Sequence, residues 1–89
     1  MRLDKYLKVS RILKRRTVSK QLAANQRVSI NGKIAKPAAE VKVGDEIEVV
    51  YGERKLKVRV LMINDVVKKN EAGNMYEVLE ETIIKEVEE

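Results

Sequence analysis

The apolar positions in the first third of the chain recur with the spacing of short amphipathic helices. The first set falls at i, i+3 and i+4, on one side of a helical turn, and consists of Leu3, Tyr6 and Leu7. This spacing predicts a helix over residues 2–10 and places Tyr6 on its buried side. The i, i+4 pair Val18 and Leu22 predicts a second helix over residues 17–25.

Beyond the second helix the hydrophobic period changes to two, which predicts short strands. Alternating apolar residues flank the dipeptide Asn31-Gly32. This dipeptide favours a two-residue hairpin, because a type I′ turn needs positive φ at both central positions. Two more strands are predicted over residues 46–51 and 54–63, joined by a tight tip. The predicted fold class is therefore α+β, with two N-terminal helices packed on a small antiparallel sheet of four to five strands.

The last quarter of the chain fits two secondary structures. The apolar residues from Met75 onward follow a helical spacing with glutamates mostly between them, but residues 75–84 also alternate as a strand would. We predict a short C-terminal helical extension that begins at about Met75. The expected organisation is a domain over residues 1–65 and an acidic extension over residues 66–89 that packs on or beside it.

The formal net charge of +5 conceals a segregation of charge around the single proline, Pro37. Residues 1–36 contain 11 Lys and Arg and one acid, a sum of +10. Residues 37–89 contain 8 Lys and Arg and 13 Asp and Glu, a sum of −5. This uneven distribution of charge indicates that the N-terminal part binds a polyanion.

Several classes of function are disfavoured by residue types that the chain lacks. It has no Cys and no His, and therefore no thiol nucleophile, no thiolate metal site and no imidazole base. The C-terminal glutamates indicate a solvated face, and no Gly-rich loop suited to a nucleotide phosphate is present. No apolar run approaches the roughly 20 residues of a membrane span. We therefore expect a cytoplasmic protein without enzymatic activity, cofactor or membrane contact.

The segment over residues 11–33 carries seven cations and no acid. On a helix or a tight helical turn, Arg11, Lys14 and Arg15 would share one face. Like charges at i, i+4 cost about 0.2–0.5 kcal/mol per pair, and no glutamate relieves that repulsion here. A solvated face is the simplest alternative, but a segment rich in Arg and free of acids favours phosphate binding.

Folded RNA fits this segment better than two other polyanions. Single-strand binders stack bases on aromatic rings, and the basic half offers only Tyr6, which we expect to be buried. A DNA-binding helix-turn-helix would read bases with polar residues of the second helix, for which the candidates are Ser19, Lys20, Gln21 and Asn25. The cations also lie before and after that helix, so a surface of two helices and a hairpin fits an RNA recognised through phosphates and shape.

Three stretches, RLDKYL, KRRTVSKQLAANQRVSING and VKVGDEIEV, resemble the S4 RNA-binding domain in order and content. The resemblance covers residues 1–50 and follows that family's pattern of Arg-Leu-Asp in the first helix, an Arg opening the second, a Val-x-Val-Asn-Gly hairpin, which reads VSING here, and a Gly-Asp turn. One departure is Gln26, where that family usually has glycine. We expect Asn25 to adopt the left-handed conformation instead, because its short polar side chain tolerates positive φ.

The length of the chain, the SRILKRRT stretch and the tail NMYEVLEE are similar to the RqcP (YabO) family of bacterial ribosome-associated proteins. This resemblance implies a factor of ribosome quality control that binds rRNA and peptidyl-tRNA on obstructed large ribosomal subunits. It further implies cooperation with an RqcH-like tailing factor that adds alanine tails, and we expect a monomer when the protein is free.

The charge pattern and the resemblance together assign ten residues to RNA binding. These are Arg2, Asp4, Lys8, Arg11, Lys14, Arg15, Arg16, Lys20, Arg27 and Lys33. The centre is expected at Arg2, Arg11, Arg15 and Arg16, and the rim at Lys14, Lys20, Arg27 and Lys33. Asp4 fits two roles equally, as a partner of the helix dipole or as a group that orients a neighbouring Arg.

Three alternatives stay open at this point. A heat-shock-type S4 factor that recycles free large subunits is the nearest, although its relatives tend to have a longer basic tail. A DNA-binding regulator is less well supported. The third is the RNA-binding appendage of an enzyme such as a pseudouridine synthase or a tRNA synthetase, which would need a catalytic partner chain.

Overall fold

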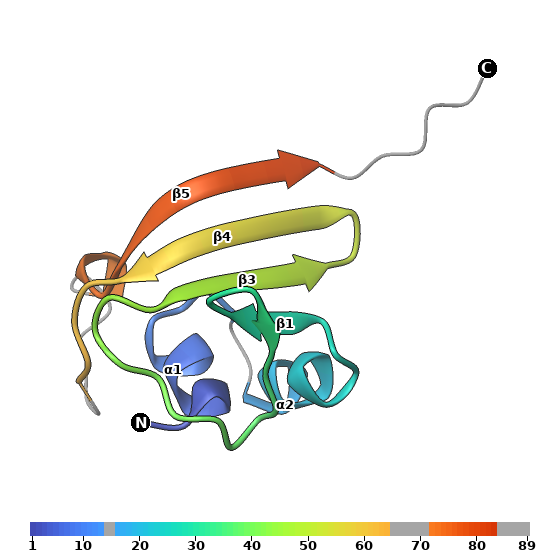
Figure 1. The fold of residues 1–89 in the computed structure, drawn as a ribbon, viewed down its shortest axis with the longest axis horizontal. Helices are drawn as coiled ribbons and strands as arrows, with labels where there is room; N and C mark the ends of the chain where they lie inside the picture. Colours follow the sequence, from blue (N-terminus) through green and yellow to red (C-terminus); the bar gives the residue numbers. More distant parts are fainter. Residues whose placement is uncertain (14–15, 65–71, 84–89) are drawn as a thin grey trace.

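The computed structural model describes residues 1–13, 16–64 and 72–83 (Figure 1). Its elements are α1 (Leu3–Val9), α2 (Arg16–Ala24), β1 (Val28–Ile30), β2 (Lys33–Ile34), β3 (Glu46–Tyr51), β4 (Arg54–Val60), the 3₁₀ turn η1 (Ala72–Asn74) and β5 (Tyr76–Ile83). The strands form one antiparallel sheet in the order β2-β1-β3-β4-β5. In Figure 1 the two helices lie beside β1 and β3, whereas β5 forms the far edge. The predicted α+β class is confirmed.

One face of the sheet packs in the core and the other faces solvent, as the period of two requires. The buried apolar side chains come from both helices, from the strands and from the segments that join them: Leu3, Tyr6, Leu7, Leu13, Ala23, Val28, Ala35, Val41, Ile47, Val49, Val58, Val60 and Met75. Charged residues alternate with these along β3 and β4, so they project from the opposite face. The helices and the sheet therefore share a single aliphatic core, and Tyr6 is its one aromatic residue.

The hairpin between β1 and β2 has the predicted two-residue turn. Asn31 and Gly32 have φ values of 52° and 83°, and Ile30 pairs with Lys33 on either side of them. The Asn31 side chain also holds this turn against the start of β3, because its Oδ1 accepts from the Glu46 N–H at 2.9 Å. Its Nδ2 donates to Asp45 Oδ1 at 3.1 Å. Asn31 therefore forms the turn and also connects the β1–β2 hairpin to the start of β3.

The N-terminus of α1 is capped by backbone carbonyls and not by a side chain. The Leu3 N–H donates to the Ala39 carbonyl at 2.8 Å, and the Asp4 N–H donates to the Pro37 carbonyl at 3.1 Å. The first N–H groups of a helix lack partners within it, so the loop around Pro37 satisfies two of them. These two hydrogen bonds fix the position of the first turn of α1, and with it the positions of Arg2 and Asp4.

The left-handed residue after α2 is Gln26, with a φ of 63°, and not Asn25 as we expected. The helix ends with the Asn25 N–H bonded to Gln21 and the Arg27 N–H bonded to Leu22, both at 2.9 Å. These bonds place the left-handed residue at position 26, one residue later than the intrinsic preference of the Asn25 side chain predicts. Gln26 therefore takes the conformation for which the S4 pattern uses glycine.

The segment after α1 is a turn that begins at Arg11, and the expectation that Arg11 shares a face with Lys14 and Arg15 stays a prediction. Arg11 has a φ of 62°, and its N–H donates to the Lys8 carbonyl at 3.0 Å. Leu13, at the end of this turn, is buried in the core, and its N–H donates to the Leu7 carbonyl at 3.0 Å. Lys14 and Arg15, the other two members of the predicted face, lie outside the described residues.

The predicted C-terminal helix is wrong for residues 76–83, which form strand β5. This strand pairs with β4 from Val60↔Tyr76 to Arg54↔Ile83, with an irregularity between Lys57 and Val58. Helical spacing alone rarely stabilises so short a helix, since isolated helices under about 12–15 residues are marginal in water. Pairing with β4 instead satisfies the backbone groups of β5 that face β4, and those of β4 that β3 leaves unpaired. The alternation noted in the sequence was the correct signal.

Tyr6 links α1 to the segment that enters β5. Its side chain is fully buried, and its hydroxyl donates to the Met75 carbonyl at 2.8 Å. Burial raises the pKa of the Tyr6 hydroxyl above its usual range, and the nearby Tyr76 adds to the effect. The phenol therefore stays neutral and donates over the whole physiological pH range. The prediction that Tyr6 is buried is confirmed.

Candidate nucleic-acid interface

The cations on the solvent face of the sheet are neutralised by neighbouring acids. Four ion pairs with N–O distances of 3.4–3.7 Å join them across the strands: Lys55–Glu48, Lys57–Glu46, Arg59–Glu46 and Arg59–Glu77. Each surface pair contributes only about 0–1 kcal/mol to stability, but together the three glutamates offset the positive charge of Lys55, Lys57 and Arg59. This face of the sheet offers little attraction to a polyanion.

The cations of the N-terminal half differ, because most have no acidic partner in the described part of the chain. Five predicted site residues are exposed and form no ion pair with an acid of residues 1–13, 16–64 or 72–83: Lys8, Arg11, Lys20, Arg27 and Lys33. Unpaired cations therefore predominate in the described N-terminal half, whereas the cations on the solvent face of the sheet are paired. Unpaired cations are the ones free to release counterions on binding phosphate.

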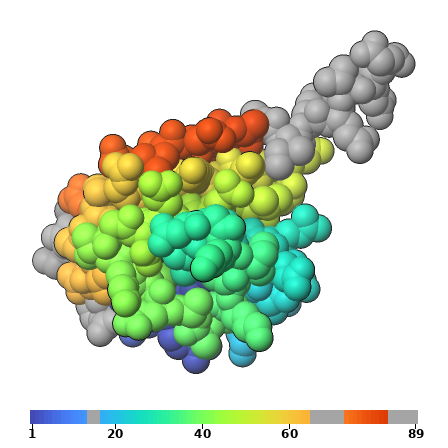
Figure 2. Space-filling model, viewed as in Figure 1, coloured from blue at the N-terminus to red at the C-terminus, as the bar shows by residue number. Residues whose placement is uncertain are grey.

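These five cations come from α1, the turn after it, α2, the turn before β1, and β2. Helix α2 packs on β1 and β3, and β2 pairs with β1, so the helix and the hairpin form a continuous surface. Figure 2 shows this surface as neighbouring cyan and green atoms on one face of the molecule. We call the surface formed by Lys20, Arg27 and Lys33 the basic hairpin surface.

Asp4 and Arg2 form a fixed pair at the start of α1. Arg2 Nε and Nη2 each lie 3.2 Å from a different oxygen of the Asp4 carboxylate, so the contact is bidentate. The Asp4 side chain is 2% exposed and also accepts from the Lys5 N–H at 2.8 Å, whereas the Arg2 side chain is 50% exposed. Asp4 lies in the first turn of α1 and holds the half-exposed Arg2 side chain, whereas a role of this pair in RNA binding stays a prediction.

The remaining predicted site residues cannot be placed in full. Arg16 is the first residue of α2, but its side chain lies outside the described part of the structure, as do Lys14 and Arg15. Among the residues expected at the centre of the site, only Arg2 and Arg11 have described side chains. Ser19, a candidate for reading DNA bases, is fully buried, which weakens the helix-turn-helix alternative.

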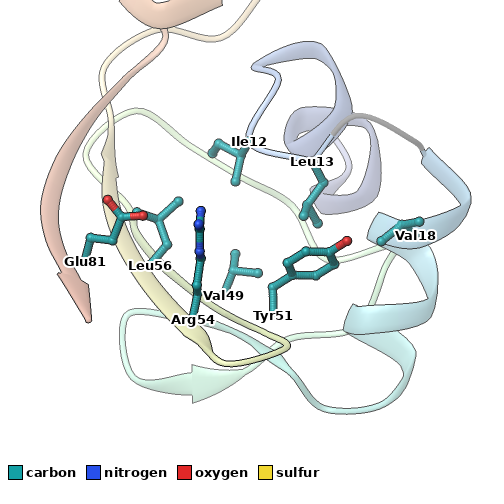
Figure 3. Close-up of a pocket in the computed structure, with 8 residues that line it drawn as sticks. All are labelled: Ile12, Leu13, Val18, Val49, Tyr51, Arg54, Leu56 and Glu81. Carbon is teal, nitrogen blue, oxygen red and sulfur yellow. The ribbon is translucent and has the colours of Figure 1, made fainter. Parts of the chain in front are cut away.

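Sequence reasoning missed a groove between the helices and the β3–β4 hairpin. Its volume is about 580 Å³, and it is lined by Ile12, Leu13, Val18, Val49, Tyr51, Arg54, Leu56 and Glu81. Figure 3 shows Tyr51 and Arg54 on either side of Val49, with Ile12 and Leu13 closing the groove from the helix side. The available signal was Tyr51 itself, an aromatic residue on the core-facing side of a strand end that the helices leave half exposed.

Among residues 1–13, 16–64 and 72–83, no group of three or more Asp, Glu, His or Cys side chains could hold a metal ion. No helix within these ranges has the length and apolar character to cross a membrane.

Comparison with known proteins gives the family. Residues 1–47 match the S4 domain. An RQC P-site tRNA stabilizing factor of Streptococcus pneumoniae is 50% identical over 86 residues, which cover 97% of this chain and 98% of the relative. This chain belongs to the RqcP family of S4-domain proteins. The protein of the same name from Bacillus subtilis is 52% identical over 81 residues, 91% of this chain and 94% of the relative.

The match to RqcP relatives extends well past the S4 domain and includes β5. The fold is also that of a solved structure of heat shock protein 15 from Vibrio cholerae, described as trimeric. The two share a TM-score of 0.81 and 29% sequence identity, over 88% of this chain and 80% of that one. The family assignment made from the sequence is confirmed.

Proposed function

We propose that this chain binds RNA on obstructed large ribosomal subunits and stabilises a peptidyl-tRNA in the P site during ribosome quality control. The proposal rests on near full-length similarity to proteins named RQC P-site tRNA stabilizing factors. It also rests on the unpaired cations of the N-terminal half, whose partners must come from outside the described part of the chain.

In the proposed mechanism, cations of this chain bind backbone phosphates of two RNA molecules at once and so hold them together. Arg2, held by Asp4, and Arg11 contact one backbone, and the basic hairpin surface contacts a second, so that rRNA and tRNA are held together. Lys8, Lys14, Arg15 and Arg16 complete the surface in this proposal. Bidentate guanidinium contacts suit phosphate oxygens, and a pre-oriented Arg2 loses less side-chain freedom on binding.

The chain acts as a binding factor without catalysis of its own, in the cytoplasm and as a monomer when free. It supports an RqcH-like factor that adds alanine tails to the stalled nascent chain. Support for the monomer comes from the exposed edge strand β5, where Glu77, Glu80 and Glu81 would repel a second copy paired edge to edge.

A second candidate is a factor that recycles free large subunits, favoured by the structural likeness to heat shock protein 15. The two candidates share the phosphate interface and differ in the subunit that they prefer. Greater identity and coverage among the RqcP relatives favour the first.

Phosphate binding of this kind predicts a steep dependence of affinity on salt. If about six phosphates are neutralised, log affinity for purified large subunits carrying peptidyl-tRNA falls with log salt at a slope of about −4 to −5. The slope is measured by titration at several KCl concentrations, with fluorescently labelled protein. A slope near zero would refute phosphate binding as the source of the affinity.

A further inference from the structure

We propose that the groove between the helices and the β3–β4 hairpin binds an unpaired RNA base. The proposal rests on the RNA-binding function and adds a base contact to an interface otherwise made of phosphate contacts. The sequence disfavoured base stacking because the basic half of the chain offers only Tyr6, which is buried. The ring in the groove is that of Tyr51, which comes from the acidic half of the sequence.

The walls of the groove suit a flat aromatic ligand. Tyr51 is 50% exposed, and its ring lies in the groove with the hydroxyl toward Val18 (Figure 3). The floor at Val49 and the roof at Leu13 are apolar. A volume of about 580 Å³ is within the range of small-ligand sites and admits a nucleobase.

Two polar groups at the groove can orient a base. Arg54 points into the same space from the opposite side of Val49 (Figure 3). A guanidinium stacks on a base or donates to its ring nitrogens and carbonyls. The Glu81 carboxylate, opposite Leu56 in the sheet, can accept from an exocyclic amino group.

The position of the groove favours RNA over an apolar protein segment. Arg11, which is exposed and has no acidic partner in the described ranges, immediately precedes Ile12 of the groove wall. Arg54 likewise forms no ion pair with a described acid. A backbone held by these cations would place one base over the groove, whereas an apolar peptide gains nothing from them.

The test compares hexaadenylate RNA with a hexamer of the same backbone that lacks its bases. The two carry the same phosphates, so any difference in affinity comes from the bases. We expect the wild-type chain to bind hexaadenylate about tenfold more tightly at low salt, since stacking on an aromatic side chain is worth this much or more per base. Methyl NMR signals of Leu13 and Val49 should shift with hexaadenylate only.

Two variants of the same residue separate stacking from mere hydrophobicity. Tyr51→Phe keeps the ring and should keep the tenfold preference, whereas Tyr51→Leu should reduce it to less than twofold. Salt dependence should be unchanged in both variants, because neither alters a charge. Unchanged signals of Tyr6 would report an intact core in both.

Two results would contradict the proposal that the groove binds a base. Both can be distinguished from a result that contradicts the proposed RNA-binding function. Equal binding of both hexamers by the wild-type chain excludes a base site while the phosphate interface stands. Shifts of the groove methyl signals with a Leu-rich peptide but not with hexaadenylate assign the groove to a protein partner. If neither hexamer binds at low salt, the phosphate interface fails together with the pocket.

Discussion

Replacing the three cations of the basic hairpin surface with glutamine should weaken binding to large subunits about 100-fold at physiological salt. In Lys20→Gln/Arg27→Gln/Lys33→Gln each substitution removes one phosphate contact and with it about 0.7–0.9 of the salt slope. The slope should therefore fall by about 2 to 3, which a binding titration at several salt concentrations measures. The substituted side chains are exposed and without acidic partners in the described structure, so the free energy of unfolding should change by less than about 0.5 kcal/mol each.

The sheet offers a matched control of identical charge. Lys55→Gln/Lys57→Gln/Arg59→Gln also removes two Lys and one Arg, and leaves the same net charge. These cations are already paired with acids, so the control should change affinity by less than about threefold and leave most of the slope. Equal losses in the two triple variants would mean that net charge alone, and not this surface, drives binding.

Removing the Tyr6 side chain should have the largest effect on stability. Tyr6 is fully buried in the core, so Tyr6→Ala should cost about 3–5 kcal/mol, measured by urea unfolding. Tyr6→Phe keeps the ring and loses only the hydrogen bond to the Met75 carbonyl, which should cost about 1–2 kcal/mol. Tyr76→Phe is the control, because the Tyr76 hydroxyl has no hydrogen-bond partner in the described structure, and a change below about 0.5 kcal/mol is expected.

The Tyr6 hydrogen bond also predicts how stability depends on pH. Burial raises the pKa of Tyr6 in the folded chain, so the stabilisation is complete below the ordinary tyrosine pKa and declines as the pH rises above it. The decline is about 1.4 kcal/mol per pH unit above about pH 10. Wild type and Tyr6→Phe should therefore become equally stable near about pH 11. A difference that stays constant from pH 7 to pH 11 would mean that the hydroxyl is not buried as described.

Local sequence signals predicted the hairpin and the charge segregation well. Asn31-Gly32 determines its own turn, because few other dipeptides accept positive φ twice. The unpaired cations could be foreseen from the absence of acids nearby. Both features depend on residues close together in the chain, so tertiary contacts did not have to be known.

Two features that depend on distant contacts, and the local geometry at the end of α2, were not predicted. Strand β5 forms because β4 offers it an edge, and its own spacing fitted a helix equally well. Gln26 takes the left-handed conformation because Arg27 bonds back to Leu22, although Asn25 has the better intrinsic preference. The Tyr51 groove arises where residues from α2, the turn before it and three strands meet, an arrangement that no local pattern encodes.

The most direct test of the account is sedimentation of a lysate through a sucrose gradient. We expect this chain to travel with large subunits that still carry peptidyl-tRNA, and the Lys20→Gln/Arg27→Gln/Lys33→Gln variant to stay at the top of the gradient. Release of the nascent chain before centrifugation should remove the wild-type protein from the large-subunit fraction. Co-sedimentation with empty large subunits alone, or with no ribosomal particle, would contradict the proposed role at the P-site tRNA.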